Sequence, residues 1–174
     1  MLSGGDRRSI AQSKPARALV EADPTCVVEL ANLAEDGDWL VSMRAMDLLE
    51  KLAHAHPQWI QPHKGLFVGP LADSASWEIR LQVVRALPLL SWTARERKRV
   101  VGILCRDIEH PQKFVRAWAL DSLATFALAD PTLMPIVVRA IDHFERSQSK
   151  ALQTRARLVR ARIGDAASRA SMPR

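Results

Sequence analysis

The chain has 174 residues, of which 48% are hydrophobic and 25% are charged, and its formal net charge is +6. This composition is typical of a folded globular protein and excludes an intrinsically disordered chain. No apolar run approaches the roughly 20 residues that a membrane-spanning helix needs, so we expect no membrane partner. Alanine, leucine and arginine are abundant, glycine is scarce and tyrosine is absent, which favours helices.

The two ends of the sequence offer little that can pack against a core. We therefore expect a flexible N-terminal segment over residues 1–14, a single repeat domain over residues 15–164 and a flexible C-terminal tail over residues 165–174. The first residues also show no apolar segment of the kind that a secretory signal contains. We expect a cytoplasmic protein in which Cys26 and Cys105 stay reduced.

Four stretches of similar sequence recur at nearly constant intervals along the chain. They cover residues 41–52, 79–90, 115–126 and 152–163, and their starts are 38, 36 and 37 residues apart. In the first three stretches apolar or small residues occupy positions i, i+4, i+7, i+8 and i+11, which form one face of an amphipathic helix, and the fourth keeps this pattern except for Arg160 at i+8. In the third stretch these residues are Val115, Ala119, Ser122, Leu123 and Phe126. Each stretch therefore predicts the first helix of a two-helix repeat.

Turn and capping signals lie between these helices. Asp23-Pro24 and Asp130-Pro131 each place a capping carboxylate before a proline at the first helical position. The acidic run at residues 35–38 predicts a turn with a helix cap. It is no calcium loop, because the sixth and twelfth positions counted from Asp36 hold Val41 and Asp47 instead of the required glycine and glutamate. Thr93 predicts a further cap. Prolines and glycines interrupt residues 59–68, where we expect a short or kinked helix.

Two of these stretches have the pattern Val115-Arg116-x-x-Ala119-x-x-Ser122-Leu123-x-x-Phe126 and Ile79-Arg80-x-x-Val83-x-x-Ala86-Leu87-x-x-Leu90. Both resemble the first helix of a HEAT repeat. The resemblance to this armadillo-like family covers residues 15–163. It implies an all-α, right-handed solenoid of four to five two-helix repeats, with second helices along the concave face. The family includes transport factors, phosphatase scaffolds and DNA glycosylases, so this fold leaves the function open.

Positive charge is concentrated in the C-terminal half of the chain. Residues 1–90 hold 9 Lys and Arg against 11 Asp and Glu, a balance of −2, whereas residues 91–174 hold 16 against 8, a balance of +8. The cations on the expected second helices are Arg95, Arg97, Lys98, Arg99, Arg139 and Arg146, and the last helix adds Arg155, Arg157, Arg160 and Arg162. Such a pattern is typical of a solvated face, of a surface for an acidic protein, or of a surface for nucleic-acid phosphates.

Trp118 departs from the repeat pattern, because the equivalent position in the other stretches holds Arg44, Gln82 or Arg155. Polar residues at this position predict that the Trp118 ring is at least partly exposed. Asp121 lies one turn further along the same face. Alkylpurine DNA glycosylases with HEAT-like folds use tryptophan and aspartate beside a basic surface, which is one interpretation of this pair. The other is a structural tryptophan that packs on a neighbouring repeat or under the stem of Arg116.

The sequence contains no recognisable catalytic motif. His54, His56 and His63 flank one turn, but no Cys or carboxylate stands at a familiar ligand spacing, so they predict no metal site. A phosphate loop, a dinucleotide fingerprint and a nucleophile elbow are all missing, and we expect no cofactor.

We therefore predict a non-catalytic binding module whose basic C-terminal half contacts another protein, one with an acidic surface. The candidate contact residues are Arg95, Arg97, Lys98, Arg99, Trp118, Asp121, Arg139 and Arg146. The alternative is a nucleic-acid-binding protein related to the alkylpurine DNA glycosylases.

Overall fold

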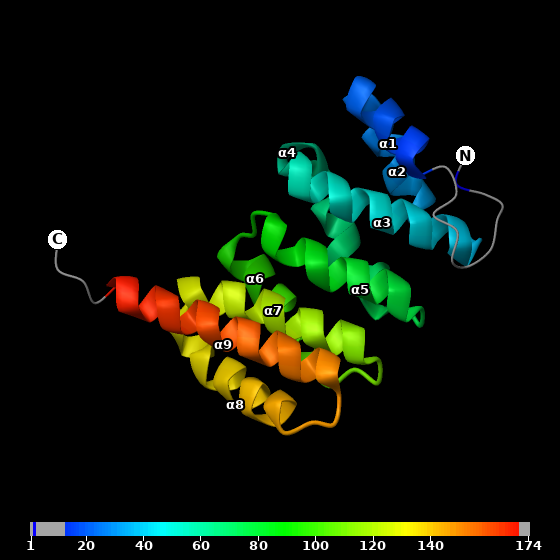
Figure 1. Cartoon of the computed structure of the whole chain (residues 1–174). Helices are drawn as coiled ribbons and strands as arrows, with labels where there is room; N and C mark the ends of the chain where they lie inside the picture. Colours follow the sequence, from blue (N-terminus) through cyan, green and yellow to red (C-terminus); the bar gives the residue numbers. More distant parts are fainter. Residues whose placement is uncertain (1, 3–12, 171–174) are drawn as a thin grey trace. The chain divides into compact units, whose positions relative to one another are not determined.

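The computed structural model describes residues 2 and 13–170, and these residues form helices and turns without any strand. The chain divides into two compact units, unit 1 over Met1–Trp92 and unit 2 over Thr93–Arg174 (Figure 1). Within the described residues, no helix combines the length and the apolar character that crossing a membrane requires.

Unit 1 is built around the long helix α3 (Trp39–Ala55), which packs against α2 on one side and α5 on the other. The remaining elements are α1 (Ser13–Ala22), the 3-10 helix η1 (Pro24–Cys26), α2 (Val27–Leu33), α4 (Pro57–Ile60), η2 (Gln61–Val68), η3 (Pro70–Asp73), α5 (Trp77–Ala86) and η4 (Leu87–Leu89). Leu48, Leu49 and Leu52 of α3 are buried in the core of this unit. Burial of one such side chain contributes about 1.5 to 3 kcal/mol to folding.

The segment between α3 and α5 is broken into short helices, as the sequence predicts for residues 59–68. Proline begins α4 and stands at the start of η2 and η3, where its missing N–H group interrupts the backbone hydrogen bonds of a continuous helix. At Gly69 a Cβ atom would lie 3.0 Å from the carbonyl oxygen of Gly65, so only glycine fits there without a shift of the backbone. The second helix of this repeat is therefore a chain of short turns.

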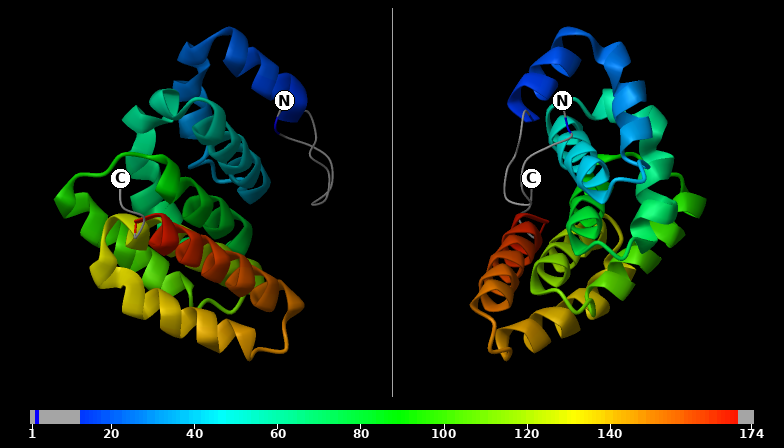
Figure 2. Two further views of the ribbon diagram at one scale, coloured as in Figure 1. Left: turned by 60° about the vertical axis from the view of Figure 1, so that its left-hand side comes forward. Right: turned by 90° about the vertical axis from the view of Figure 1, so that its right-hand side faces the viewer.

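Unit 2 is built around α7 (Lys113–Ala129), which packs against every other helix of the unit. These are α6 (Ala94–Asp107), the 3-10 helix η5 (Pro131–Leu133), α8 (Met134–Glu145) and α9 (Lys150–Ala170). Figure 2 shows α9, drawn in orange and red, beside both α7 and α8. The unit therefore has one core, which the apolar faces of these helices share.

The structure confirms the predicted repeat. The four first helices, α3, α5, α7 and α9, begin at Trp39, Trp77, Lys113 and Lys150, with the same intervals of 38, 36 and 37 residues that separate the stretches in the sequence. The five residues that form the apolar face of α7 are all buried, and so are the equivalent residues of the stretches 41–52 and 79–90. In α9, Leu152, Ala156 and Val159 are buried and Ile163 is half-buried.

The predicted caps are confirmed as well. Asp23 and Asp130 accept hydrogen bonds from the backbone N–H and the hydroxyl of Thr25 and Thr132, and the first turn after each is a 3-10 helix. The hydroxyl bonds, followed by the backbone bonds, lower the pKa of both carboxyl groups. Asp38 caps α3 by accepting from the N–H of Leu40. Further along the chain, Thr93 and Glu96 form a reciprocal capping box at the start of α6.

Helices extend into both of the segments that we expected to be flexible. Helix α1 begins at Ser13, and Leu2 is buried with its carbonyl oxygen 2.6 Å from Nη1 of Arg44. At the other end α9 continues to Ala170, so residues 165–170 are helical although they carry no apolar stripe. Alanines favour this continuation through their high helix propensity. The other residues of the two segments, 1, 3–12 and 171–174, lie outside the described part.

Candidate binding site in unit 2

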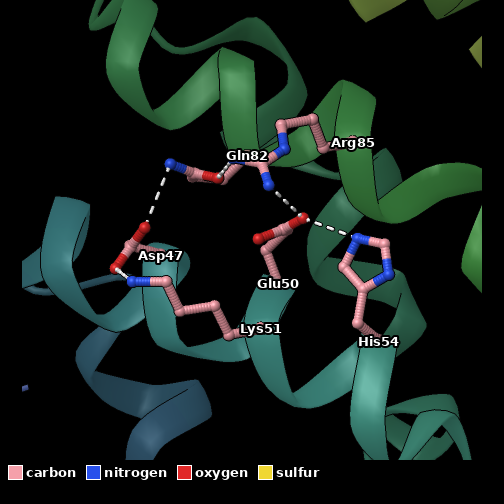
Figure 3. A network of polar contacts seen from close by, with 6 residues as sticks. All are labelled: Asp47, Glu50, Lys51, His54, Gln82 and Arg85. Carbon is pink, nitrogen blue, oxygen red and sulfur yellow. Dashed lines mark hydrogen bonds and ion pairs between the residues drawn. The ribbon is translucent and has the colours of Figure 1, made fainter. Parts of the chain in front are cut away.

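Polar side chains connect the two first helices within unit 1 (Figure 3). The carboxylate of Glu50 on α3 is completely buried at 0% exposure, and its Oε1 lies 3.0 Å from both Nη2 of Arg85 on α5 and Nε2 of His54. Nearby, Asp47 accepts a hydrogen bond of 3.5 Å from Gln82. Burial raises the pKa of Glu50, and the positive charge of Arg85 opposes this shift.

The same arrangement joins α7 to α9 within unit 2. The Asp121 carboxylate lies 2.9 Å from Nη1 of Arg155 and 3.3 Å from Nη1 of Arg162, and Arg162 also donates to the Asp121 backbone carbonyl at 2.7 Å. The guanidinium of Arg155 covers the Trp118 ring, with its Cζ atom 3.9 Å from the ring centroid. Trp118 and Asp121 thus hold α9 against α7, and both carboxylate oxygens of Asp121 are engaged.

Trp118 is half-buried, but the reasoning that predicted its exposure is wrong for the equivalent residues. Arg44 is only 3% exposed and Gln82 only 8% exposed. A polar residue can be buried at this position because it finds polar partners in the same unit, the Leu2 carbonyl for Arg44 and Asp47 for Gln82. The residue that covers the Trp118 ring is Arg155. Arg116 donates instead to the Ile108 carbonyl at 2.9 Å.

Three of the arginines on α9 are paired with carboxylates of unit 2. Arg155 and Arg162 bind Asp121, and Arg160 bridges Asp142 and Glu145 on α8 at 2.6 and 2.9 Å. These cations stabilise the packing of α9, so much of the positive charge in the last helix is neutralised locally. Within the described residues, the exposed side chains of Arg95, Lys98, Arg139 and Arg146 form no such ion pair.

The four cations at the start of α6 divide between two faces of the helix. Arg97 and Lys98 line a groove of about 600 Å³ between the start of α6 and the turn that precedes α8. The other residues that line it are Ala94, Val101, Asp130 and Leu133. A helix turns by about 100° per residue, which places Arg95 and Arg99 on a neighbouring face. Arg139 on α8 and Arg146, which directly follows this helix as its C-cap, are exposed and stand about two turns apart on one face.

The groove combines positive charge with an apolar surface. Ala94, Val101 and Leu133 supply apolar atoms, and the exposed ammonium of Lys98 stands beside them. The hydrogen bonds from Thr132 lower the pKa of the Asp130 carboxyl most, and the positive charge of nearby Arg97 lowers it further. Lys98 is therefore the cation of the groove whose charge is least compensated.

Sequence reasoning identified Arg97 and Lys98 but missed the other side of the groove. Asp130 was recognised only as a helix cap, and Leu133 was not among the candidate contact residues. Their place opposite α6 depends on how α6 and η5 both pack around α7, which no local pattern encodes.

Two of the histidines have structural contacts within unit 1. His54 pairs with Glu50, and His56 stacks on Trp59 with 3.8 Å between the ring centroids. Among the described residues, no group of three His, Cys, Asp or Glu side chains is placed to hold a metal ion. Both cysteines are free thiols and half-buried.

Solved structures share this fold. Designed armadillo repeat proteins match with probability 1.00, and a computationally designed example for modular peptide recognition has a TM-score of 0.61 and 16% identity over 84% of this chain and 67% of its own. A second one, determined in complex with the peptide (KR)4, gives the same values, and a third has a TM-score of 0.60 and 17% identity. Neither a family model nor a curated protein matches the sequence. The chain therefore has an all-α helical repeat fold of the armadillo and HEAT type.

Proposed function

We propose that the chain is a non-catalytic binding scaffold that holds an acidic segment of a protein partner on the cations of α6 and α8. The helical repeat fold supports a protein-binding role, since the similar designed proteins were made for peptide recognition. One of them binds the basic peptide (KR)4. Residues 91–174 of this chain carry a balance of +8, so the complementary partner is acidic.

The observation that carries this proposal is the contrast between two groups of cations in unit 2. In the first group, Arg155, Arg160 and Arg162 form ion pairs that hold α9 in place. Lys98 and Arg139, in contrast, are exposed and form no ion pair with a described carboxylate. Cations that do not stabilise the fold keep their charge available for a partner.

An acidic protein fits these cations better than a nucleic acid does. Proteins that bind single strands stack the bases on exposed aromatic rings, and the Trp118 ring is covered by Arg155. The groove beside Lys98 is lined in part by the apolar atoms of Val101 and Leu133. Its apolar lining is of more use to a peptide side chain than to a sugar-phosphate backbone.

Binding of fluorescein-labelled poly-glutamate to the full chain tests the proposal, with a labelled DNA duplex as the competing probe. We expect poly-glutamate to bind at low salt, and Arg139→Glu with Arg146→Glu to reduce its affinity by about tenfold or more. The matched control is Arg157→Glu with Arg169→Glu, which changes the net charge by the same amount on α9. We expect the control to lose less than about threefold.

Three outcomes overturn the proposal. If poly-glutamate does not bind at low salt, the cations have no role as a contact surface. If both double variants lose affinity equally, the attraction is an effect of net charge alone. If the duplex binds more tightly than poly-glutamate, with a steep salt dependence that the α8 variant flattens, the surface is a nucleic-acid interface.

A further inference from the structure

We propose that the groove between α6 and the turn before α8 is a docking site for an extended peptide segment that carries a carboxylate next to a large apolar side chain. This inference rests on the proposed function and names the chemistry that one part of the surface recognises. The volume of the groove, about 600 Å³, lies within the range of ligand sites, roughly 300 to 1,000 Å³. Its lining belongs entirely to unit 2.

The apolar half of the site comes from Val101 and Leu133. Both side chains are half-buried and line the groove, so they present apolar surface that solvent still reaches. The burial of a leucine or valine side chain of a partner against them would remove apolar area from water on both sides. The groove therefore selects for an apolar residue, which a surface made only of cations cannot do.

The charged side chains of the site are Arg97, Lys98 and Asp130, and within the described residues Lys98 is the cation whose charge is least compensated. Asp130 lies close enough to Arg97 to interact with its charge, whereas the exposed Lys98 pairs with no carboxylate in the described chain. The three charges sum to one positive charge, which matches a single carboxylate of the partner. The ammonium of Lys98 is a flexible point charge, so it can reach a carboxylate at the rim.

Asp130 places a negative charge in the groove, opposite in sign to Lys98. Both of its described hydrogen bonds, from the N–H and the hydroxyl of Thr132, fall on Oδ1. Oδ2 thus remains an acceptor for a backbone N–H of the bound segment. Because the pKa of Asp130 is lowered, this carboxyl stays negative at neutral pH and repels a partner carboxylate. The segment should therefore place its carboxylate at Lys98 and a donor at Asp130.

The test uses labelled peptides and the full chain, with affinities from fluorescence anisotropy at about 0.15 M salt. The probe repeats Gly-Glu-Leu-Ser, and the two comparison peptides repeat Gly-Gln-Leu-Ser and Gly-Glu-Ser-Ser. We expect the probe to bind at least about tenfold more tightly than either comparison peptide. If the probe and the Gly-Glu-Ser-Ser peptide bind equally well, the apolar side chains of the groove have no role in binding and the inference fails.

Substitutions in the groove give the second part of the test. Lys98→Met keeps most of the stem and removes the charge, and we expect it to weaken binding of the probe by about tenfold but to leave the weak binding of Gly-Gln-Leu-Ser unchanged. Leu133→Ala should weaken the probe about fivefold and the Gly-Glu-Ser-Ser peptide hardly at all. Lys150→Met is the matched control, because Lys150 is an exposed lysine outside the groove.

The failure of this inference can be told apart from the failure of the proposed function. If the probe binds but Lys98→Met and Lys150→Met have equal effects, the acidic partner binds outside the groove and only the groove assignment is wrong. If no acidic polymer or peptide binds, the proposed function fails with it. Methyl NMR spectra of the 19.4 kDa chain separate the cases, since docking must shift the Val101 and Leu133 resonances.

Discussion

Arg85 on α5 reaches the completely buried carboxylate of Glu50 on α3, with 3.0 Å between Nη2 and Oε1. Removal of the arginine would leave a buried charge without its cation, so Arg85→Ala should destabilise the chain by about 3 kcal/mol. Glu50→Gln in the same chain should recover part of this loss, because it removes the charge that Arg85 compensates. Urea denaturation of the two single variants and the double variant measures the coupling. Additive losses would contradict a direct interaction.

The pKa of Glu50 predicts how stability changes with pH. Because burial raises this pKa above its ordinary value of 4.5, the folded state holds the proton more tightly than the unfolded state. The contribution of Glu50 is therefore fully present below pH 4.5 and is lost as the pH rises through the raised pKa. Relative to Glu50→Gln, the wild-type chain should lose stability over that window. A pH series of urea midpoints measures this difference.

His54 and Asp47 face the same carboxyl group, so the pH series needs a control. In a His54→Gln background, the stability difference between the chain that keeps Glu50 and the chain that also carries Glu50→Gln should keep its sign. The reason is that the difference arises from titration of the Glu50 carboxyl itself. A difference that disappears in this background would assign the pH dependence to the imidazole.

Asp121 should behave as a structural residue. Its side chain is 18% exposed and holds Arg155 and Arg162, so Asp121→Asn should destabilise the chain by about 1 to 2 kcal/mol, a value reduced by the partial exposure of the pairs. Asp165→Asn is the control, since Asp165 is exposed on α9 and lies in no described ion pair. Equal urea midpoints for both variants would show that the Asp121 pairs do not hold α9 on α7.

The thiol of Cys105 should be slow to react. Burial raises its pKa above the ordinary value of 9.0, because the thiolate is poorly solvated inside unit 2. In a Cys26→Ser chain, the alkylation rate against pH reports Cys105 alone, and its midpoint should lie above 9.0. Unfolding in urea should return the midpoint to the ordinary value. A midpoint below it in the folded chain would mean that a nearby cation dominates over burial.

The apolar periodicity of the sequence predicted which face of each first helix is buried. Val115 and Ala119 are buried because an apolar stripe on a helix marks the face that is withdrawn from water. The Asp-Pro-Thr caps were equally readable, since each is complete within three neighbouring residues. Helix positions and starts therefore followed from local information.

Buried polar residues could not be predicted in the same way. Arg44 and a solvated arginine look identical in a hydrophobic pattern, because the partner that permits burial, the Leu2 carbonyl, lies 42 residues away in the sequence. Asp121 presents the same difficulty, since its arginines stand 34 and 41 residues further along. For the groove, the sequence supplied Lys98 but not the packing that brings Asp130 opposite to it.

The ion pairs between successive first helices have a direction. In unit 1 the carboxylate belongs to the earlier helix, α3, and the arginine to the later one, α5; in unit 2 Asp121 of α7 and Arg155 of α9 follow the same order. Two copies of α3 placed face to face would bring Glu50 against Glu50, and two copies of α9 would oppose their arginines. The pairs thus favour each helix beside its own successor and disfavour a pairing of two identical helices from different molecules.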